Sequence, residues 1–182
     1  FIMTKVLVLP DSFKGSLTSE EVGQAIREGL ERTDLALDVR SFVIADGGEG
    51  TVAAFVSAKN GSVMHIETLD AYLKPIVVPV GILDEKTVVI EVASIVGLTM
   101  YSKEESNLLE ATSFGVGLVL KQLHALGYKR IIVGLGGSST NDGGMGLLQA
   151  LGYAFYDDKG KLLKPRASSL ALIKSVVRSE EH

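Results

Sequence analysis

Short apolar runs followed by glycine-bearing polar loops are the most regular pattern in this 182-residue chain. The aliphatic run 5–9 predicts a buried strand that ends at Pro10 and Asp11. Hydroxyl residues in 16–19, followed by Glu20 and Glu21, predict the start of a helix, because hydroxyl caps and negative charge stabilise a helix N-terminus. The predicted helix carries one apolar face, formed by Val22, Ile26 and Leu30.

The same order of strand, loop and helix occurs twice more. Residues 37–44 predict a strand, residues 45–51 a glycine loop and residues 52–58 a helix. Further along, a strand at 129–133 leads into the glycine loop 134–144 and an apolar helical segment through Leu151. Three such units indicate an α/β fold with a parallel sheet.

The remaining segments have a different texture. Residues 62–93 read as strands with a turn at 83–87, and Pro75 and Pro79 are expected at sheet edges. Residues 107–126 predict a long helix that ends at Gly127. A final hairpin is expected in 153–163 and helical structure in 169–177, so we predict two domains, 1–61 and 62–182, the second with a β-rich part at 62–93.

Composition excludes several classes of protein. A hydrophobic content of 46% supplies a core, and a net charge of −4 gives no basic surface for nucleic acid. No apolar stretch approaches the ~20 residues that span a bilayer. The chain has no cysteine, which fits a reducing compartment, and we expect a cytoplasmic location.

The loop 134–144 has the composition of a phosphate site. Glycines let backbone N–H groups approach a phosphate closely, and the following helix N-terminus favours negative charge. No Walker sequence occurs, and Ser139 stands where a dinucleotide fingerprint needs its third glycine. The loop could also be purely structural, with Asn141 or Asp142 as a helix cap.

Two further loops carry charged residues. In 45–51, Asp46 and Glu49 lie among glycines directly after a strand, which suits a metal ligand or a base for a substrate hydroxyl, although an N-cap and a first-turn carboxylate explain them equally well. In 10–16, Lys14 could neutralise a phosphate or carboxylate or simply be solvated. Glu91 and Ser94 stand at the end of the strand 88–92, where they could join the same site or serve the structure equally well.

Histidine gives no support for a metal site or a hydrolase triad. His65, His124 and His182 show no ligand spacing.

Three blocks together resemble the bacterial glycerate kinase type I family: PDSFKGSL at 10–17, ADGGEGT at 45–51 and GLGGSSTNDGG at 134–144. Glu91 and the stretch 112–115 lie between them in matching order. The resemblance implies two α/β lobes around a cleft, one of them a Rossmann/flavodoxin-like parallel-sheet unit. Because such proteins are about twice as long, it also implies that this chain is their N-terminal half and is inactive alone.

The resemblance further implies an ATP-dependent kinase that uses Mg²⁺ and phosphorylates D-glycerate, giving 2-phosphoglycerate or 3-phosphoglycerate. Phosphoryl transfer requires positioning of the substrates and neutralisation of phosphate charge, and the three loops contain residue types suited to both. Expected partners are the small molecules glycerate and ATP, without nucleic acid or membrane, and the oligomeric state is left open, a dimer included.

The roles expected on this basis are as follows. Lys14 neutralises phosphate charge, Asp46 orients or deprotonates the glycerate hydroxyl, and Glu49 or Asp142 holds Mg²⁺. The expected catalytic residues are thus Lys14, Asp46 and Glu49. The expected substrate- and phosphate-binding residues are Asp11, Ser12, Ser16, Gly47, Gly48, Glu91, Gly136, Gly137, Ser138, Thr140, Asn141 and Asp142.

Two other functions compete with the kinase. One is a non-catalytic module that binds a sugar acid or nucleotide. The other is an oxidoreductase, which is weaker because the dinucleotide fingerprint fails and no acidic residue is well placed for a ribose.

Overall fold

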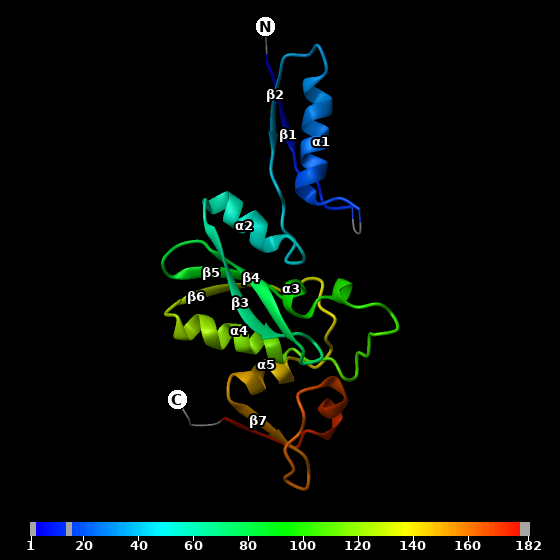
Figure 1. The fold of residues 1–182 in the computed structure, drawn as a ribbon, viewed down its shortest axis with the longest axis vertical. Coiled ribbons are helices and arrows are strands. Elements are labelled where there is room, and N and C mark those ends of the chain that lie inside the picture. Colours follow the sequence, from blue (N-terminus) through cyan, green and yellow to red (C-terminus); the bar gives the residue numbers. More distant parts are fainter. Residues whose placement is uncertain (1–2, 14–15, 179–182) are drawn as a thin grey trace. The chain divides into compact units, whose positions relative to one another are not determined.

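The computed structural model describes residues 3–13 and 16–178 and forms two compact units, Phe1–Asp46 and Gly47–His182 (Figure 1). The compact units divide at 46/47 rather than at the predicted domain boundary 61/62. The reason is that helix α2 (Thr51–Lys59) packs against two strands of the second unit.

The first unit is a single β-α-β motif. Strands β1 (Thr4–Val8) and β2 (Leu37–Ser41) are parallel, with Thr4 opposite Leu37, and α1 (Ser19–Glu31) connects them. Thr18 caps α1, since its hydroxyl accepts a hydrogen bond from the Glu21 amide while the Glu21 carboxylate accepts one from the Thr18 amide. The predicted strand and helix are confirmed here, although the strand expected at 37–44 ends at Ser41.

The second unit contains a mixed four-stranded sheet in the order β3–β4–β5–β6. Its strands are β3 (Ser62–Leu69), β4 (Pro75–Ile82), β5 (Thr87–Glu91) and β6 (Arg130–Gly134). Strand β4 is antiparallel to both β3 and β5, whereas β5 and β6 are parallel. The α/β class is therefore confirmed, with small sheets.

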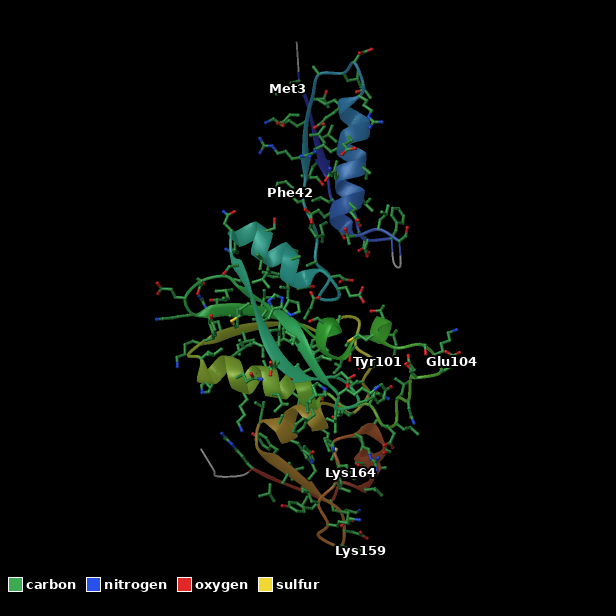
Figure 2. The ribbon with its side chains drawn as sticks, in the orientation of Figure 1. Met3, Phe42, Tyr101, Glu104, Lys159 and Lys164 are labelled. Atoms are coloured by element: carbon green, nitrogen blue, oxygen red, sulfur yellow. The ribbon has the colours of Figure 1, made fainter. Side chains whose placement is uncertain are left out.

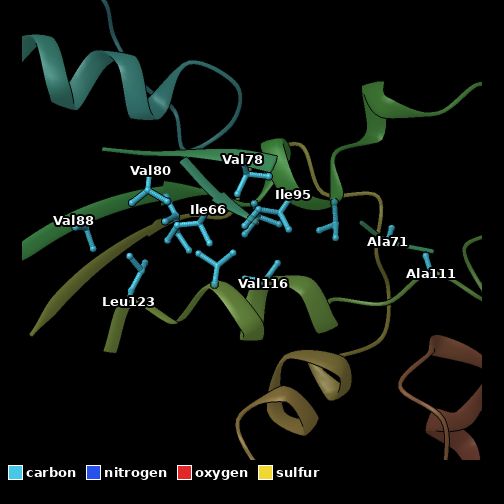
Figure 3. Close-up of a cluster of buried hydrophobic side chains, with 13 residues drawn as sticks. Ile66, Ala71, Val78, Val80, Val88, Ile95, Ala111, Val116 and Leu123 are labelled. Carbon is cyan, nitrogen blue, oxygen red and sulfur yellow. The ribbon is translucent and has the colours of Figure 1, made fainter. Parts of the chain in front are cut away.

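Helices cover both faces of this sheet (Figures 1 and 3). Val88 and Ile90 join a core cluster with Val116, Val119 and Leu123 of helix α4 (Phe114–Ala125). Because strand side chains alternate, the intervening Val89 lies on the other face, where it and α2 crowd Gly81. Every residue of β5 is buried as a result.

Two expectations about this unit need correction. Strand β4 is internal rather than an edge, but it pairs with β5 only through Gly81 and Ile82, so Pro79 removes no hydrogen bond on that side. The helix expected at 107–126 begins only at Phe114, because the preceding residues turn to pack Ala111 and Thr112 into the core.

The last segment forms a small layer of its own. Helix α5 (Met145–Ala150) leads into β7 (Tyr153–Tyr156), which pairs with β8 (Ser175–Arg178). The expected hairpin is reduced to one bridge between Tyr156 and Leu162, and the helix expected at 169–177 is wrong beyond the 3₁₀ turn η2 (Ala167–Leu172). Lys159 and Lys164, which are labelled in Figure 2, lie in this segment. Within the described residues, no helix is long and apolar enough to cross a bilayer.

Candidate functional site

The candidate site lies where the parallel strands β5 and β6 end. Glu91 is opposite Gly134 in the register, and the Val92 amide donates to the Gly134 carbonyl at 2.9 Å. Ligands of parallel strands bind beyond their carboxyl ends. The short helix α3 (Ala93–Val96) and the loop 134–144 both begin at this edge.

Glu91 connects this edge to α2. Its side chain lies on the same face of β5 as Val89, and its Oε2 accepts a hydrogen bond from the Val52 amide at 3.0 Å. The residue is 8% exposed. A buried carboxylate at a helix N-terminus satisfies one of the free backbone donors there, so Glu91 fixes where α2 begins.

The glycine loops 45–51 and 134–144 touch through their backbones. The Gly136 amide donates to the Gly47 carbonyl at 2.7 Å. A Cβ on Gly134 would lie 2.6 Å from the Gly47 oxygen, and one on Gly136 would lie 2.7 Å from the Gly48 nitrogen. No side chain larger than hydrogen fits between these loops, which explains the glycines. Of the predicted site residues, the structure brings Gly47, Gly48, Gly136 and Gly137 together.

A third segment joins these two loops. Residues 96–98 pair with 137–139, since the Leu98 amide donates to the Gly137 carbonyl and the Ser139 amide to the Val96 carbonyl, both at 2.8 Å. The next residue, Thr99 of the 3₁₀ turn η1 (Leu98–Met100), donates a hydrogen bond from its hydroxyl to Oε1 of Glu49.

The polar tip of the loop 134–144 is internally ordered. The hydroxyls of Ser138 and Thr140 are 2.8 Å apart, and the Thr140 amide donates to Ser138 Oγ at 3.1 Å. Gly137 has φ of +71°, which glycine adopts readily. Gly137 and Asn141 are exposed at this tip, which leaves the loop open to a ligand.

Asp142 is buried beneath the loop, at 2% exposure. Its Oδ2 accepts hydrogen bonds from the Ser113 amide at 2.8 Å, the Ser113 hydroxyl at 2.9 Å and the Gly146 amide at 3.0 Å, with Thr112 Oγ1 at 3.4 Å. Its Oδ1 accepts from the Gly144 amide at 3.1 Å. The carboxylate thus caps the starts of α4 and α5.

Two tyrosines hold the segment that follows η1. The Tyr101 hydroxyl accepts from the Ala71 amide at 3.2 Å, the Tyr72 hydroxyl accepts from the Asn107 amide at 2.7 Å, and the two rings meet edge to face. Burial, aided by the neighbouring Asp70, raises the pKa of Tyr101 to about 12. Tyr101 therefore stays neutral and serves as an anchor (Figure 2).

The other predicted residues belong to the first unit. Asp11, Ser16 and Asp46 are exposed, and the Ser12 amide donates to Asp11 Oδ1 at 2.7 Å. Lys14 lies outside the described residues.

Two carboxylates, those of Asp142 and Glu49, were expected to bind Mg²⁺, and their surroundings show whether each fits a metal ligand. Both oxygens of Asp142 are occupied by N–H and O–H donors, so Asp142 does not fit a metal ligand. Glu49 is exposed, and none of the described residues donates to its Oε2, so it fits as one ligand. The described chain contains no cluster of three metal-ligating side chains.

Sequence reasoning missed three polar residues of this region. Ser113 had a usable signal, because a serine directly before a helix is a common N-cap. Thr112 and Thr99 had none, since their partners Asp142 and Glu49 are 30 and 50 residues away in the chain.

Comparison with a family model finds a match over residues 6–182 to the glycerate kinase family. Among curated relatives, a glycerate kinase of Bacillus subtilis (strain 168) is 36% identical over 94% of this chain and 45% of its own length. The glycerate 2-kinase of Escherichia coli (strain K12) is 40% identical over 86% of this chain and 41% of its own.

A solved structure gives the same result. The crystal structure of a glycerate kinase 2 homologue from Salmonella typhimurium LT2 superposes with a TM-score of 0.76 at 34% identity, covering 96% of this chain and 47% of that one. The chain thus spans about half the length of the relatives it matches.

Proposed function

This chain belongs to the glycerate kinase family, and from that premise we propose that it contributes to ATP-dependent phosphorylation of a D-glycerate hydroxyl, giving 2-phosphoglycerate or 3-phosphoglycerate and ADP. The observation that carries the proposal is the contact between the glycine loops at Gly47 and Gly136, at the carboxyl edge of β5 and β6. The contact fixes the position of the loop that follows β6, and phosphoryl transfer depends on the positioning of the groups around the phosphate.

A proposal about the fold goes with this function, because the sheets in the structure are small. We propose that the β-α-β motif of the first unit is part of a Rossmann/flavodoxin-like sheet, and that the second unit is a lobe of a two-domain enzyme. A two-stranded parallel sheet is rarely stable alone, which supports a larger sheet around β1 and β2.

The proposed roles follow the three loops. Gly137 and Ser138 cradle phosphate, with Thr140 and Asn141 beside them. Gly136 positions this loop, because its amide already donates to the Gly47 carbonyl. Asp46 orients or deprotonates the glycerate hydroxyl, and Lys14 neutralises phosphate charge. Asp11, Ser12 and Ser16 are proposed substrate contacts from the first loop.

Two predicted residues take different roles. Glu91 and Asp142 hold helix starts, which supports a positioning role for both. Glu49 alone is retained as a proposed ligand for Mg²⁺, which when bound neutralises phosphate charge and commonly uses only one or two protein carboxylates.

The test is an assay of glycerate-dependent ADP release with the Asp46→Asn variant of the full-length protein. A positioned acid–base group contributes about 10²–10⁴-fold, so kcat should fall by that factor with little change in the glycerate KM. Asp34→Asn, an exposed site three residues beyond the end of α1, is the matched control and should be neutral. Unchanged turnover in Asp46→Asn removes Asp46 from the catalytic residues.

The competing function is a module that binds without catalysis. Calorimetry separates the two, since glycerate or ATP binding without ADP formation favours the module. We further propose a cytoplasmic location, with small-molecule substrates as the partners.

A further inference from the structure

We infer that Thr99 is a positioning residue that holds the Glu49 carboxylate at the candidate site and ties it to the loop 134–144. The inference rests on the proposed function for its catalytic consequence. Its structural part concerns only residues of the second unit.

The contact is between side chains of two separate segments. The Thr99 hydroxyl donates to Oε1 of Glu49, and both residues are exposed. Oε2 of Glu49 receives no hydrogen bond from the described residues, so one oxygen is anchored and the other can face a ligand. A hydrogen bond accepted by a carboxylate is stronger than a hydrogen bond between two neutral groups.

Glu49 stands in a stretch whose sequence restricts the backbone little. It stands between Gly48 and Gly50, and Gly50 has φ of +87° with nothing near the position of a Cβ. Glycines on both sides leave the backbone its widest conformational range. The side-chain bond to Thr99 therefore limits where the carboxylate can lie.

Thr99 itself is held by the opposite loop. The preceding residue donates its amide to the Gly137 carbonyl at 2.8 Å, and Gly97 pairs with Ser138. Two residues before Glu49, Gly47 accepts from the Gly136 amide at 2.7 Å. The two loops are thus joined directly at Gly47 and, through residues 97–99, at Glu49 itself, so a shift of 136–138 would be transmitted to its carboxylate.

The test compares Thr99→Val, which keeps the shape and removes the donor, with Thr99→Ser, which keeps the donor. Thr33→Val is the matched control, because Thr33 is an exposed threonine whose hydroxyl donates to the Leu30 carbonyl at the end of α1. NMR relaxation of the amides of residues 48–50 is the first measurement. We expect their order parameters to fall from about 0.85 to below about 0.6 in Thr99→Val only.

Steady-state kinetics of the same variants is the second measurement. Residues that orient a site group typically affect activity about 10–100-fold, so kcat should fall by that factor in Thr99→Val, with the ATP KM nearly unchanged and activity restored in Thr99→Ser. Unaltered order parameters in Thr99→Val overturn the inference. Altered order parameters without turnover in any variant of the full-length protein, wild type included, support the anchor and count against the proposed kinase instead.

Discussion

Ser113 donates two hydrogen bonds to one oxygen of Asp142, from its amide at 2.8 Å and from its hydroxyl at 2.9 Å. Ser113 directly precedes α4, and Asp142 lies just before α5. The Ser113 hydroxyl also accepts from the Leu147 amide at 3.0 Å. The pair therefore joins two helix N-termini, whose partial positive charges stabilise the buried carboxylate between them.

The first prediction is that Asp142→Asn destabilises the protein strongly. Both carboxylate oxygens of Asp142 accept hydrogen bonds, so in either orientation an asparagine would place its NH₂ group against a hydrogen-bond donor. Leaving buried donors without acceptors costs about 1–3 kcal/mol. Urea unfolding in magnesium-free buffer measures the loss.

Asp157→Asn is the control for this prediction. Asp157 accepts two amides, those of Lys159 and Lys161, but both bind Oδ1, so an asparagine oxygen can keep them. The loss there should be clearly smaller. If Asp142→Asn is as stable as wild type without Mg²⁺ and differs only when Mg²⁺ is added, Asp142 is a metal ligand and the capping role is wrong.

The second prediction concerns the contact between the glycine loops. In Gly136→Ala the new methyl would lie 2.7 Å from the Gly48 nitrogen and 2.8 Å from its Cα. The loops must separate, at a cost of about 1–3 kcal/mol typical of overpacking. A urea titration checks this, and affinity for ATP should fall in parallel.

Gly29→Ala provides the opposite case. Gly29 is inside α1, and its Cβ position is open. Alanine there should raise the free energy of unfolding by about 0.5–1 kcal/mol. Equal stability of Gly136→Ala and wild type would mean that the loops are not in contact.

Local patterns predicted most elements, and distant partners explain most misses. The strands at 5–9 and 129–133 and the helix capped by Thr18 depend on neighbours in sequence, so their signals are local. The adjacency of the ends of β5 and β6 also follows from a general rule of parallel strands.

The failures have a different origin. Residues 107–113 have helical composition, yet the Thr112 amide donates to the Ala71 carbonyl of a remote turn. The segment Ser175–Arg178 becomes a strand only because β7 pairs with it. The partnership of Asp142 with Ser113 is equally non-local, so the sequence could suggest Asp142 as a cap for the helix that follows it, but not as a cap for α4.

The third prediction is an acid-dependent loss of stability through Asp84. Hydrogen bonds from the Lys86 amide and the Thr87 side chain, with the Arg130 charge as a smaller cause, hold the pKa of Asp84 below its usual 3.8. A lowered pKa in the folded state gives stability that is present above pH 3.8 and lost as the pH falls below it.

Asp84→Asn tests this dependence. The asparagine oxygen can still accept from the Lys86 amide, but it does not titrate. Urea midpoints measured from neutral pH to strongly acidic pH should converge for the two proteins below the ordinary pKa. Both curves still fall in acid, because the pKa values of Glu21 and Glu105 are lowered by the same kind of backbone hydrogen bond, but this contribution is common to the two proteins and cancels from their difference. Parallel curves throughout would contradict the role of Asp84.

The fourth prediction concerns Thr51, the first residue of α2, which is 2% exposed. Its hydroxyl has no hydrogen-bond partner among the described residues. A buried hydroxyl without a partner costs about 1–3 kcal/mol, so Thr51→Val, which replaces it with a methyl group of the same shape, should raise the free energy of unfolding by about 1 kcal/mol. Thr51→Ser keeps the hydroxyl and loses the methyl, so it should be less stable than wild type. Urea unfolding of both variants decides the matter: a Thr51→Val protein no more stable than wild type would show that the hydroxyl has a partner, such as a buried water, that offsets its burial.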